Sequence, residues 1–272
     1  MEEKTTVLSS RDNPLIRRVR RLLSSAKARR EERLYVLEGA RLCADAAASG
    51  VKVEALLYTS RGAQAYPEAF DGAAAAARER YQLAESLMGY AADTETPQGL
   101  LCLCEMPALD NRPLSVTIER SGRYLGLEDI QDPSNLGAII RTAEAFGVNG
   151  LLLSDGCCDP YNPKVLRGSM GGVFRLPLLP AGDMAQTASE LRGAGLGLYA
   201  CVPDRSAPSL RETPLVGGTV CLIGNEGNGL KEETIAACSG RLTIPMAGRA
   251  ESLNAAMAAG IVMWELCSSP AG

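Results

Sequence analysis

The stretch Val220-Cys221-Leu222-Ile223-Gly224-Asn225-Glu226-Gly227-Asn228-Gly229-Leu230 decides the fold of the second half of this chain. An apolar run of four residues that ends in a glycine-rich turn is typical of a buried strand followed by a tight loop. Glycine lets the backbone approach a ligand closely, because it has no Cβ. The stretch therefore predicts a binding loop at the end of a buried strand.

A second loop follows the next predicted strand, residues 241–244, which Pro245 ends. The segment Ile244-Pro245-Met246-Ala247-Gly248 leads on to Glu251-Ser252-Leu253-Asn254, where Ser252 is the predicted cap of an apolar helix over residues 253–266. Both loops are rich in small polar residues and follow strands, so we expect them to form one pocket. The first loop is not a Walker loop, since no Gly-Lys-Ser/Thr follows its glycines.

Composition limits the classes of protein that this chain can belong to. Its 272 residues are 46% hydrophobic, which favours two domains over one. No apolar stretch approaches the roughly 20 residues of a membrane span, and residues 1–10 lack the apolar core of a signal peptide. The nine cysteines show no zinc or thioredoxin spacing, which favours reduced thiols in a cytoplasm and no metal site.

Histidine is absent from the sequence. Its absence excludes Ser-His-Asp and Cys-His catalysis and removes the commonest metal ligand. Any chemistry must depend on carboxylates, Lys, Arg, Tyr, Cys, hydroxyls, backbone dipoles or a cofactor.

The first segment is basic, although the formal net charge of the chain is −4. Arg17, Arg18, Arg20 and Arg21 lie among apolar residues at near-helical spacing, which predicts an amphipathic helix with a basic face. Taken alone, such a charge run is a solvated helix face. A patch that contacts phosphates becomes the better interpretation only if the rest of the chain points to RNA.

Strands and helices alternate on both sides of a stretch of loop-forming residues. We expect a compact α/β unit over residues 1–106, a linker over 107–121 and a second α/β unit over 122–272. The predicted strands lie at 34–37, 53–58 and 99–104 in the first unit, and at 124–127, 150–153, 173–176, 196–201, 219–223 and 241–244 in the second. The predicted helices lie at 39–48, 73–77 and 83–90, and at 136–146, 164–168, 184–192, 230–238 and 253–266. This alternation in the second unit is typical of a parallel sheet covered on both faces.

The first strand-to-helix connection of the second unit carries Asp132-Pro133-Ser134-Asn135. We expect Ser134 or Asn135 to cap the helix that follows, with Arg141 projecting from its second turn. Taken alone, Asn135 is equally well a plain cap and Arg141 a surface cation.

Three motifs together resemble those of the SpoU (TrmH-type) 2′-O-ribose RNA methyltransferases. Residues 135–147 (NLGAIIRTAEAFG) resemble the first motif, residues 224–230 are similar to the second, and residues 244–246 with 251–254 resemble the third. The motifs occur in the family's order over residues 124–266 and are highly specific together. More weakly, the basic segment and residues 35–39 resemble the substrate-binding domain that precedes many members. Residues 248–251 match no fixed pattern of the family.

The resemblance implies an α/β enzyme of the SPOUT superfamily with a parallel sheet and a deep trefoil knot. The smaller N-terminal α/β domain is then similar to ribosomal protein L30e and helps to hold RNA. The periodicity of the sequence gives no sign of a knot, and general rules of chain topology disfavour one. The implied reaction is S-adenosylmethionine-dependent 2′-O-ribose methylation of a nucleotide in structured RNA, with ribosomal RNA ahead of transfer RNA, by a homodimer.

The resemblance also implies roles for particular residues. The cofactor is expected to bind through main-chain polar groups and apolar walls at Gly224, Asn225, Gly227, Ile244, Met246 and Leu253. For the two glycines the plainer interpretation is a tight turn. The residues expected to serve catalysis are Asn135, Arg141, Glu226, Ser252 and Asn254, and those expected to bind RNA are Arg17, Arg18, Arg20 and Arg21.

Within the catalytic set, Glu226 is expected to bond the target nucleotide or to orient Arg141, while Ser252 and Asn254 position ribose or phosphate. A guanidinium with a pKa above about 12 rarely gives up its proton. Arg141 is therefore expected to stabilise the developing alkoxide and the neighbouring phosphate rather than to act as the base.

Two other classes of protein remain as alternatives. A dinucleotide-dependent oxidoreductase would use a glycine loop, but the order Gly-x-Gly-x-x-Gly is absent after the first strand of either unit. A non-catalytic RNA-binding module would explain the basic segment but would leave the three C-terminal motifs without a role.

Overall fold

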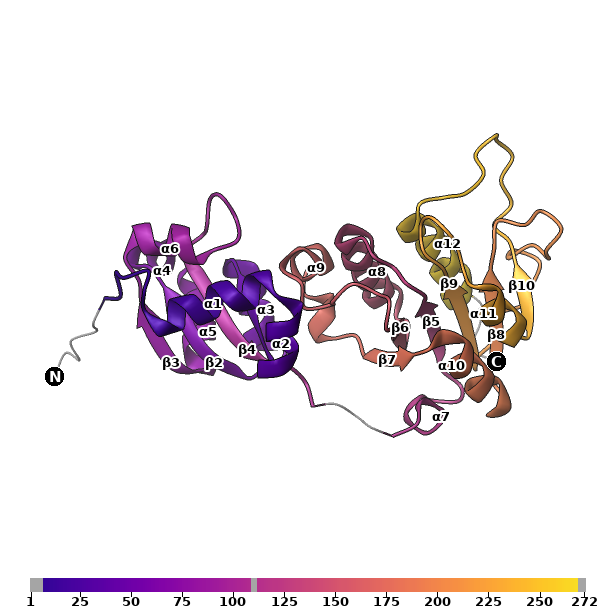
Figure 1. The fold of residues 1–272 in the computed structure, drawn as a ribbon, viewed down its shortest axis with the longest axis horizontal. Coiled ribbons are helices and arrows are strands. Elements are labelled where there is room, and N and C mark those ends of the chain that lie inside the picture. Colours follow the sequence, from indigo (N-terminus) through magenta and orange to yellow (C-terminus); the bar gives the residue numbers. More distant parts are fainter. Residues whose placement is uncertain (1–6, 109–111, 269–272) are drawn as a thin grey trace. The chain divides into compact units, whose positions relative to one another are not determined.

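The computed structural model describes residues 7–108 and 112–268 (Figure 1). The chain folds into two compact units, each with a sheet and a core of its own. One unit holds Met1–Ala108 and Tyr161–Phe174, and the other holds Leu109–Pro160 and Arg175–Gly272. In the described ranges, no helix is long and apolar enough to cross a membrane.

The first unit is built on a mixed sheet of four strands in the order β1-β4-β2-β3. The strands are β1 (Leu34–Glu38), β2 (Val53–Tyr58), β3 (Ala77–Gln82) and β4 (Leu100–Glu105). β4 pairs antiparallel with both β1 and β2, whereas β3 pairs parallel with β2. Most residues of the two central strands are buried, as expected for strands covered on both faces.

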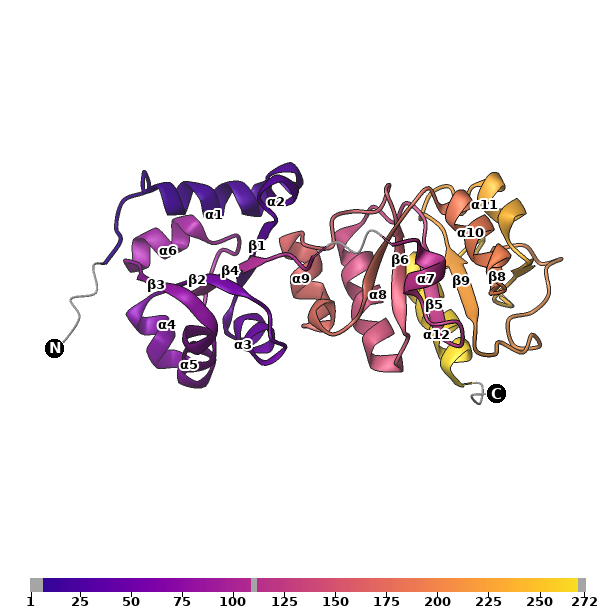
Figure 2. The same cartoon turned by 90° about the horizontal axis from the view of Figure 1, so that it is seen from below.

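Helices cover both faces of this sheet, with α1, α2 and α6 on one side and α3, α4 and α5 on the other (Figure 2). Their bounds are α1 (Pro14–Ser24), α2 (Ala26–Glu32), α3 (Ala40–Ala48), α4 (Ser60–Ala65), α5 (Pro67–Ala76) and α6 (Glu85–Ala91). A further helix, α9 (Pro163–Ser169), contacts β1, and a 3-10 turn, η1 (Gly172–Phe174), follows it. The predicted boundaries placed this segment, residues 161–174, in the second domain.

The basic segment forms two helices rather than the single one that the periodicity predicted. Asn13 caps α1 by accepting from the amide of Leu15, and Ser25 caps α2 by accepting from the amide of Ala28. Arg29 is buried and donates to the carbonyls of Leu22 and Leu23, at the C-terminal end of α1. A serine cap therefore starts a new helix where the predicted one would have continued.

The second unit is built on a six-stranded sheet in the order β10-β8-β9-β5-β6-β7, and all of its pairings are parallel. The strands are β5 (Arg123–Leu127), β6 (Gly150–Ser154), β7 (Leu178–Gly182), β8 (Gly197–Cys201), β9 (Thr219–Ile223) and β10 (Gly240–Leu242). The predicted parallel α/β sheet is confirmed, and the trefoil knot stays a prediction.

Two pairs of helices cover the second sheet, and Figure 2 shows them on opposite faces. The helices are α7 (Leu114–Thr117), α8 (Pro133–Phe146), α10 (Met184–Gly193), α11 (Glu232–Ala237) and α12 (Ala255–Ser268). α8 and α12 pack against each other and against β5, β6 and β9, while α10 and α11 pack together beside β7 and β8. α7 lies within the predicted linker, of which residues 109–111 lie outside the described residues.

One predicted strand was wrong and one strand was missed, each for a local reason. Residues 173–176 do not form a strand; the chain makes the turn η1 and enters β7 only at Leu178, after Pro177. β3 was missed because its sequence, ARERYQ, is polar and mostly exposed at a sheet edge. Hydrophobic periodicity finds strands that bury a face, and β3 buries little.

Gly62 and Gly72 provide a matched test of packing in the first unit. A Cβ on Gly62 would lie 2.6 Å from the carbonyl oxygen of Gly99, whereas a Cβ on Gly72 would meet nothing within 4 Å. We expect Gly62→Ala to destabilise the unit by about 1–3 kcal/mol and Gly72→Ala to stabilise it by about 0.5–1 kcal/mol. Thermal unfolding of both full-length variants measures this, and an upward shift for Gly62→Ala would contradict the close backbone approach.

Candidate functional site

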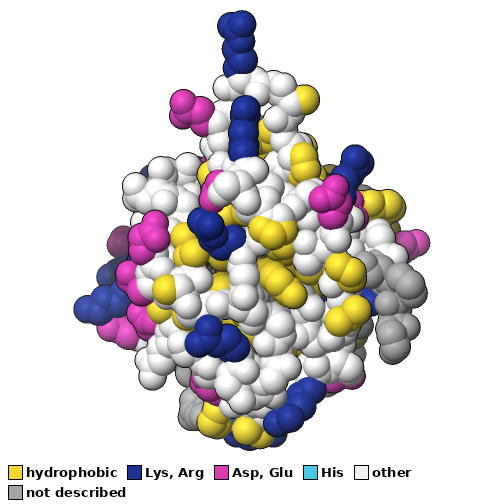
Figure 3. Space-filling view, turned by 90° about the vertical axis from the view of Figure 1, so that its right-hand side faces the viewer, with side chains coloured by type: hydrophobic (Ala, Val, Ile, Leu, Met, Phe, Trp, Pro, Cys, Tyr) yellow, Lys and Arg dark blue, Asp and Glu magenta, His cyan; other side chains and the backbone are white. Residues whose placement is uncertain are grey.

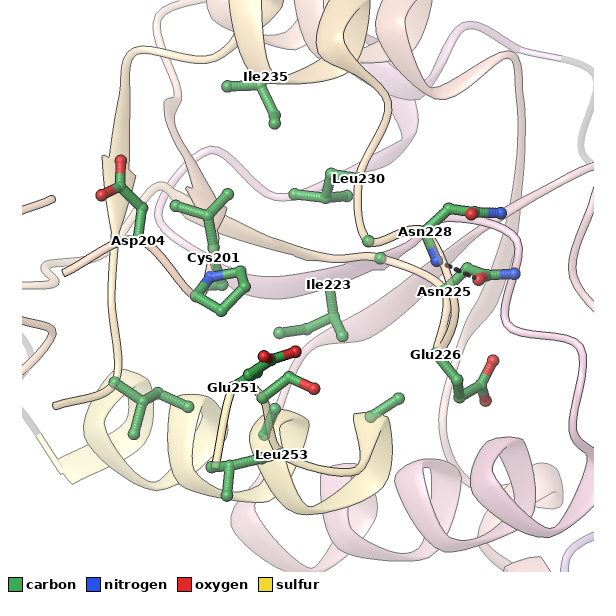
Figure 4. A pocket seen from close by; sticks show the side chains of 18 of the residues that line it. Cys201, Asp204, Ile223, Asn225, Glu226, Asn228, Leu230, Ile235, Glu251 and Leu253 are labelled. Atoms are coloured by element: carbon green, nitrogen blue, oxygen red, sulfur yellow. Dashed lines mark hydrogen bonds between the residues drawn. The ribbon is translucent and has the colours of Figure 1, made fainter. Parts of the chain in front are cut away.

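A cavity of about 520 Å³ lies beyond the carboxyl ends of β8 and β9 (Figure 4). Ligands of open parallel sheets bind at this edge. The glycine loop, residues 224–230, and the loop of residues 244–253 both line the cavity, so the two loops share one pocket. All six residues assigned to the cofactor line it, namely Gly224, Asn225, Gly227, Ile244, Met246 and Leu253.

The glycine loop is folded back on itself around Asn225. The Asn225 Oδ1 accepts from the amides of Gly227 and Asn228 at 2.7 and 3.0 Å, and its Nδ2 donates to the carbonyl of Asp129 at 3.1 Å. At Gly224 a Cβ would lie 2.1 Å from the carbonyl carbon of Gly229. Only glycine fits there, because the two ends of the loop are in backbone contact.

Glu128, the residue that follows β5, holds the far end of the same loop. Its carboxylate is 1% exposed and accepts from the Lys231 amide at 2.8 Å and from Thr234 Oγ1 at 2.6 Å. These bonds satisfy donors at the start of α11, which has no side-chain cap of its own. The sequence placed Glu128 directly after a strand, but nothing there indicated that it would anchor a loop about one hundred residues away.

Asp129 strengthens this anchor. The Lys231 Nζ lies 3.0 Å from Asp129 Oδ2, and Ser154 Oγ donates to Asp129 Oδ1 at 2.8 Å. Burial opposes ionisation of Asp129, but the bonds from Lys231 and Ser154 outweigh it and hold the pKa of this carboxyl below its ordinary value. Asp129 is therefore a carboxylate at neutral pH, and it fixes both Lys231 and, through its carbonyl, Asn225.

Three of the five residues assigned to catalysis meet at the side chain of Asn135. The Asn135 Nδ2 donates to Glu226 Oε1 at 2.6 Å, and the Asn254 Nδ2 donates to Asn135 Oδ1 at 3.0 Å. One amide thus joins α8, the glycine loop and the start of α12. Ser252 does not take part in these bonds; it is exposed and lines the cavity.

The structure corrects the predicted caps of two helices. Asp132 caps α8 by accepting from the amide of Ser134, so Pro133 is the first helical residue and Asn135 lies inside the first turn. Asn254, not Ser252, caps α12 by accepting from the amides of Ala256 and Met257. Proline at the first helical position is a known signal for a helix start, and the predicted start of α8 did not take it into account.

Arg141 lies apart from this cluster. Its side chain is exposed, and it lies in the third turn of α8 rather than in the predicted second turn. In the described residues, Arg141 makes no hydrogen bond or ion pair with Glu226. Six residues along an α-helix turn the side chain by about 120° from that of Asn135. Glu226 bonds to Asn135 instead, and its expected role in orienting Arg141 or bonding the target nucleotide stays a prediction.

Apolar walls and carboxylates dominate the cavity. Figure 4 shows Ile223, Leu230 and Leu253 around the space, with the Glu251 and Glu226 carboxylates beside it. The charged lining residues are Asp204, Glu226, Glu232, Glu251 and Arg241, and the Arg241 Nη1 lies 2.9 Å from Asp204 Oδ2. The lining carries a net negative charge, which suits a ligand with positive groups.

The outer face of the second unit near β8, β10 and α11 gathers hydrophobic side chains at its centre, with Lys and Arg side chains between and around them (Figure 3). In the described residues, no group of three or more Cys, Asp or Glu side chains could hold a metal ion.

The four arginines assigned to RNA already have partners in the first unit. Arg18 donates to Glu32 and Glu54 at 2.5 and 2.6 Å, and Arg21 also bonds Glu32. Arg17 lies 3.5 Å from Asp12, while Arg20 donates to the carbonyl of Ala92 at 2.9 Å. Carboxylates therefore neutralise much of the predicted basic face. The sequence could not show this neutralisation, because Glu54 lies on another element.

Comparison with known proteins finds one family model for each half of the chain. A model of the SpoU rRNA Methylase family matches residues 122–264, and a model of the MRM3-like substrate binding domain matches residues 13–102. An uncharacterized tRNA/rRNA methyltransferase of Synechocystis is 32% identical over 95% of this chain and 92% of its own length.

Two further proteins are similar to this chain, one by sequence and one by solved structure. The 23S rRNA (guanosine(2553)-2′-O)-methyltransferase RlmP of Bacillus subtilis is 33% identical over 68% of this chain and 71% of its own. The solved structure of an AdoMet-bound rRNA methyltransferase from Sinorhizobium meliloti has a TM-score of 0.83 and 29% identity, covering 96% of this chain and 97% of its own. The second and third motifs line one pocket, and Asn135 of the first motif joins them through its bonds to Glu226 and Asn254. With the family model that matches residues 122–264, this shows that the chain belongs to the SpoU rRNA methylase family.

Proposed function

We propose that this protein transfers a methyl group from S-adenosylmethionine to a ribose 2′-hydroxyl of structured RNA, with ribosomal RNA as the substrate ahead of transfer RNA. The observation that carries the proposal is the meeting of Asn135, Glu226 and Asn254 at the edge of the cavity. Each residue comes from a different family motif. A 2′-O-methyltransferase and an AdoMet-bound enzyme among the relatives support the reaction and the cofactor.

The cavity fits S-adenosylmethionine in size and charge. Its volume of about 520 Å³ lies within the range for small-molecule sites. Apolar walls at Ile223, Leu230 and Leu253 suit a purine ring, and the backbone of the glycine loop offers polar groups without side chains in the way. When bound, the cofactor supplies an electrophilic methyl group on a sulfonium, and the carboxylates of the lining complement that positive charge.

The residues of the chain then have to orient the 2′-hydroxyl and receive its proton. Methyl transfer needs in-line geometry and little covalent chemistry from the protein. Glu226 bonds Asn135 through one oxygen, and among the described residues no side chain donates to its other oxygen. That oxygen is the proposed acceptor for a hydrogen bond from the ribose hydroxyl. Asn135 and Asn254 hold the carboxylate in place, and Ser252 offers a hydroxyl to ribose or phosphate.

We further propose that the enzyme is a homodimer that associates through α12. Met257, Ile261 and Trp264 lie on one stripe of this helix and are 64%, 37% and 58% exposed. They line a groove with Thr142 and Phe146 of α8, where the Phe146 and Trp264 rings lie 5.7 Å apart. Exposed large apolar side chains that cluster on one face of a helix favour an interaction surface.

A role for Arg141 at the interface of the proposed dimer fits better than a role in the cofactor cavity of the same chain. It precedes Thr142, which lines the groove, so dimerisation through α12 would bring Arg141 to the subunit boundary. There it would stabilise the phosphate and the developing alkoxide of a substrate bound by the partner.

The two other classes of protein fit the molecule less well. The glycine loop closes on Gly229 and Leu230 rather than opening toward a pyrophosphate, which disfavours a dinucleotide oxidoreductase. A non-catalytic RNA-binding module would have no use for the Asn135 cluster beside a cavity.

All nine cysteines are free, which supports a reducing cytoplasm.

The test of catalysis is a variant of Arg141. We expect Arg141→Ala to lower the single-turnover rate of methyl transfer to ribosomal RNA about a hundredfold or more, because an oriented cation is lost near a developing anion. Cofactor affinity should stay near wild type. Arg141→Lys should recover little, since it lacks the planar guanidinium fork. A wild-type rate for Arg141→Ala would make Arg141 a surface cation.

The glycine loop gives a matched pair for cofactor binding. Gly224→Ala places a Cβ into the backbone of Gly229, whereas Gly227→Ala meets only Asn225 Oδ1 at 3.4 Å. We expect Gly224→Ala to abolish binding of S-adenosylmethionine in calorimetry and Gly227→Ala to retain it within about tenfold, because an ordinary van der Waals contact is tolerated. Equal affinities for the two variants would show that the cofactor does not need this loop conformation.

The dimer is tested by a charge on the exposed stripe of α12. Met257→Lys should yield a monomer in analytical ultracentrifugation, because the buried interface would then contain an unpaired ammonium. Val116→Lys is the control, since Val116 is 63% exposed on α7 and is not among the groove residues. A dimeric Met257→Lys protein would place the interface elsewhere.

A further inference from the structure

Tyr90 is an exposed aromatic residue on a helix whose other apolar residues are buried. Leu87, Met88 and Ala91 of α6 pack into the core of the first unit, while the Tyr90 side chain is 38% exposed. Core packing therefore does not explain an aromatic ring at this position.

Two guanidinium groups lie over the Tyr90 ring. The Arg11 and Arg20 guanidinium carbons are 4.8 and 5.5 Å from the ring centroid. Cation–π attraction draws each cation to the ring, but the two cations repel each other. The Arg20 Nη1 also donates to the carbonyl of Ala92, which fixes this guanidinium beside the ring.

The charge balance along α1 sets this cluster apart. Arg17, Arg18 and Arg21 each lie against a carboxylate of Asp12, Glu32 or Glu54. In the described part of the chain, neither Arg11 nor Arg20 forms an ion pair. Two cations without an ion-pair partner thus lie together at Tyr90, at a site where an exposed ring offers a stacking surface.

We propose that Arg11, Arg20 and Tyr90 form a binding site for an unpaired nucleotide of the RNA substrate. An unpaired nucleotide has the two features that this cluster complements: a flat base, which stacks on aromatic rings or guanidinium planes, and a phosphate, which pairs with arginine. A paired duplex hides its base faces, and an acidic peptide brings charge without a flat ring. The inference rests on the proposed function, since it takes RNA as the substrate.

The site differs from the basic face that the sequence predicted. Of Arg17, Arg18, Arg20 and Arg21, only Arg20 belongs to it, and Arg11 and Tyr90 are new. The pre-set position of the Arg20 guanidinium lowers the entropy lost when a nucleotide binds. The cluster therefore acts as a clamp for a loop or bulge of RNA, separate from the cavity that holds the cofactor.

The experiment compares full-length variants on two RNA probes, an oligo(U) single strand and a fully paired RNA duplex of equal length. We expect Tyr90→Leu to weaken oligo(U) binding about tenfold, as loss of a base–aromatic stack does, and Tyr90→Phe to bind like wild type. Duplex binding should change much less. Arg11→Gln with Arg20→Gln should weaken oligo(U) binding and flatten its salt dependence, since each phosphate contact releases counterions.

The control removes the same charge from paired positions. Arg61→Gln with Arg78→Gln should leave oligo(U) affinity within about threefold, because Glu85 and Glu105 already compensate these cations. Circular dichroism melting of every variant separates loss of binding from loss of fold.

Three results would overturn the inference: wild-type affinity in the Tyr90→Leu and double Gln variants, an equal loss of oligo(U) binding in the control, or an equal loss of duplex binding in Tyr90→Leu. Failure of the proposed function would look different. In that case the wild-type protein would neither bind S-adenosylmethionine nor methylate unmodified ribosomal RNA, whatever its affinity for oligo(U).

Discussion

The side-chain amide of Asn135 makes the two hydrogen bonds on which the proposed active site depends. It donates to Glu226 on the glycine loop and accepts from Asn254 at the start of α12. A buried amide that lost either partner would leave a polar group unsatisfied, at a cost of about 1–3 kcal/mol. Because its two partners lie 91 and 119 residues away in the chain, this one residue links the placement of both loops to the position of α8.

The parallel sheet makes this link possible. β5 and β9 lie side by side, so Glu128 and Asp129 at the end of one strand reach the loop that leaves the other. Their bonds to Asn225, Lys231 and Thr234 hold the glycine loop against the end of β5. The close backbone approach of Gly224 to Gly229 holds the two ends of the loop together. The glycine loop, which lines the cavity, is thus held both by side chains at the end of β5 and by its own backbone.

Much of the fold and of the candidate site could be predicted from the sequence. The remaining features could not, for definite physical reasons. Apolar runs such as residues 219–223 indicated buried strands, because burial on both faces demands them. The polar edge strand β3 carries no such pattern. Asn135 was assigned to the site but as a cap, since its bond to Glu226 depends on how distant segments pack. For the same reason Glu32 and Glu54 were not recognised as the partners of Arg18, and the cluster at Tyr90 was missed.

The most direct measurement is the single-turnover rate of 2′-O-methylation by Asn135→Asp, at saturating S-adenosylmethionine and unmodified ribosomal RNA. This substitution keeps the size and shape of the side chain but replaces the donor that faces Glu226 with a second carboxylate, and two like charges at hydrogen-bond distance repel. We predict a rate about a hundredfold below wild type, with the protein still folded at the assay temperature and its cofactor affinity little changed. A wild-type rate of 2′-O-methylation would contradict the central claim that the Asn135 amide holds the reacting groups in place.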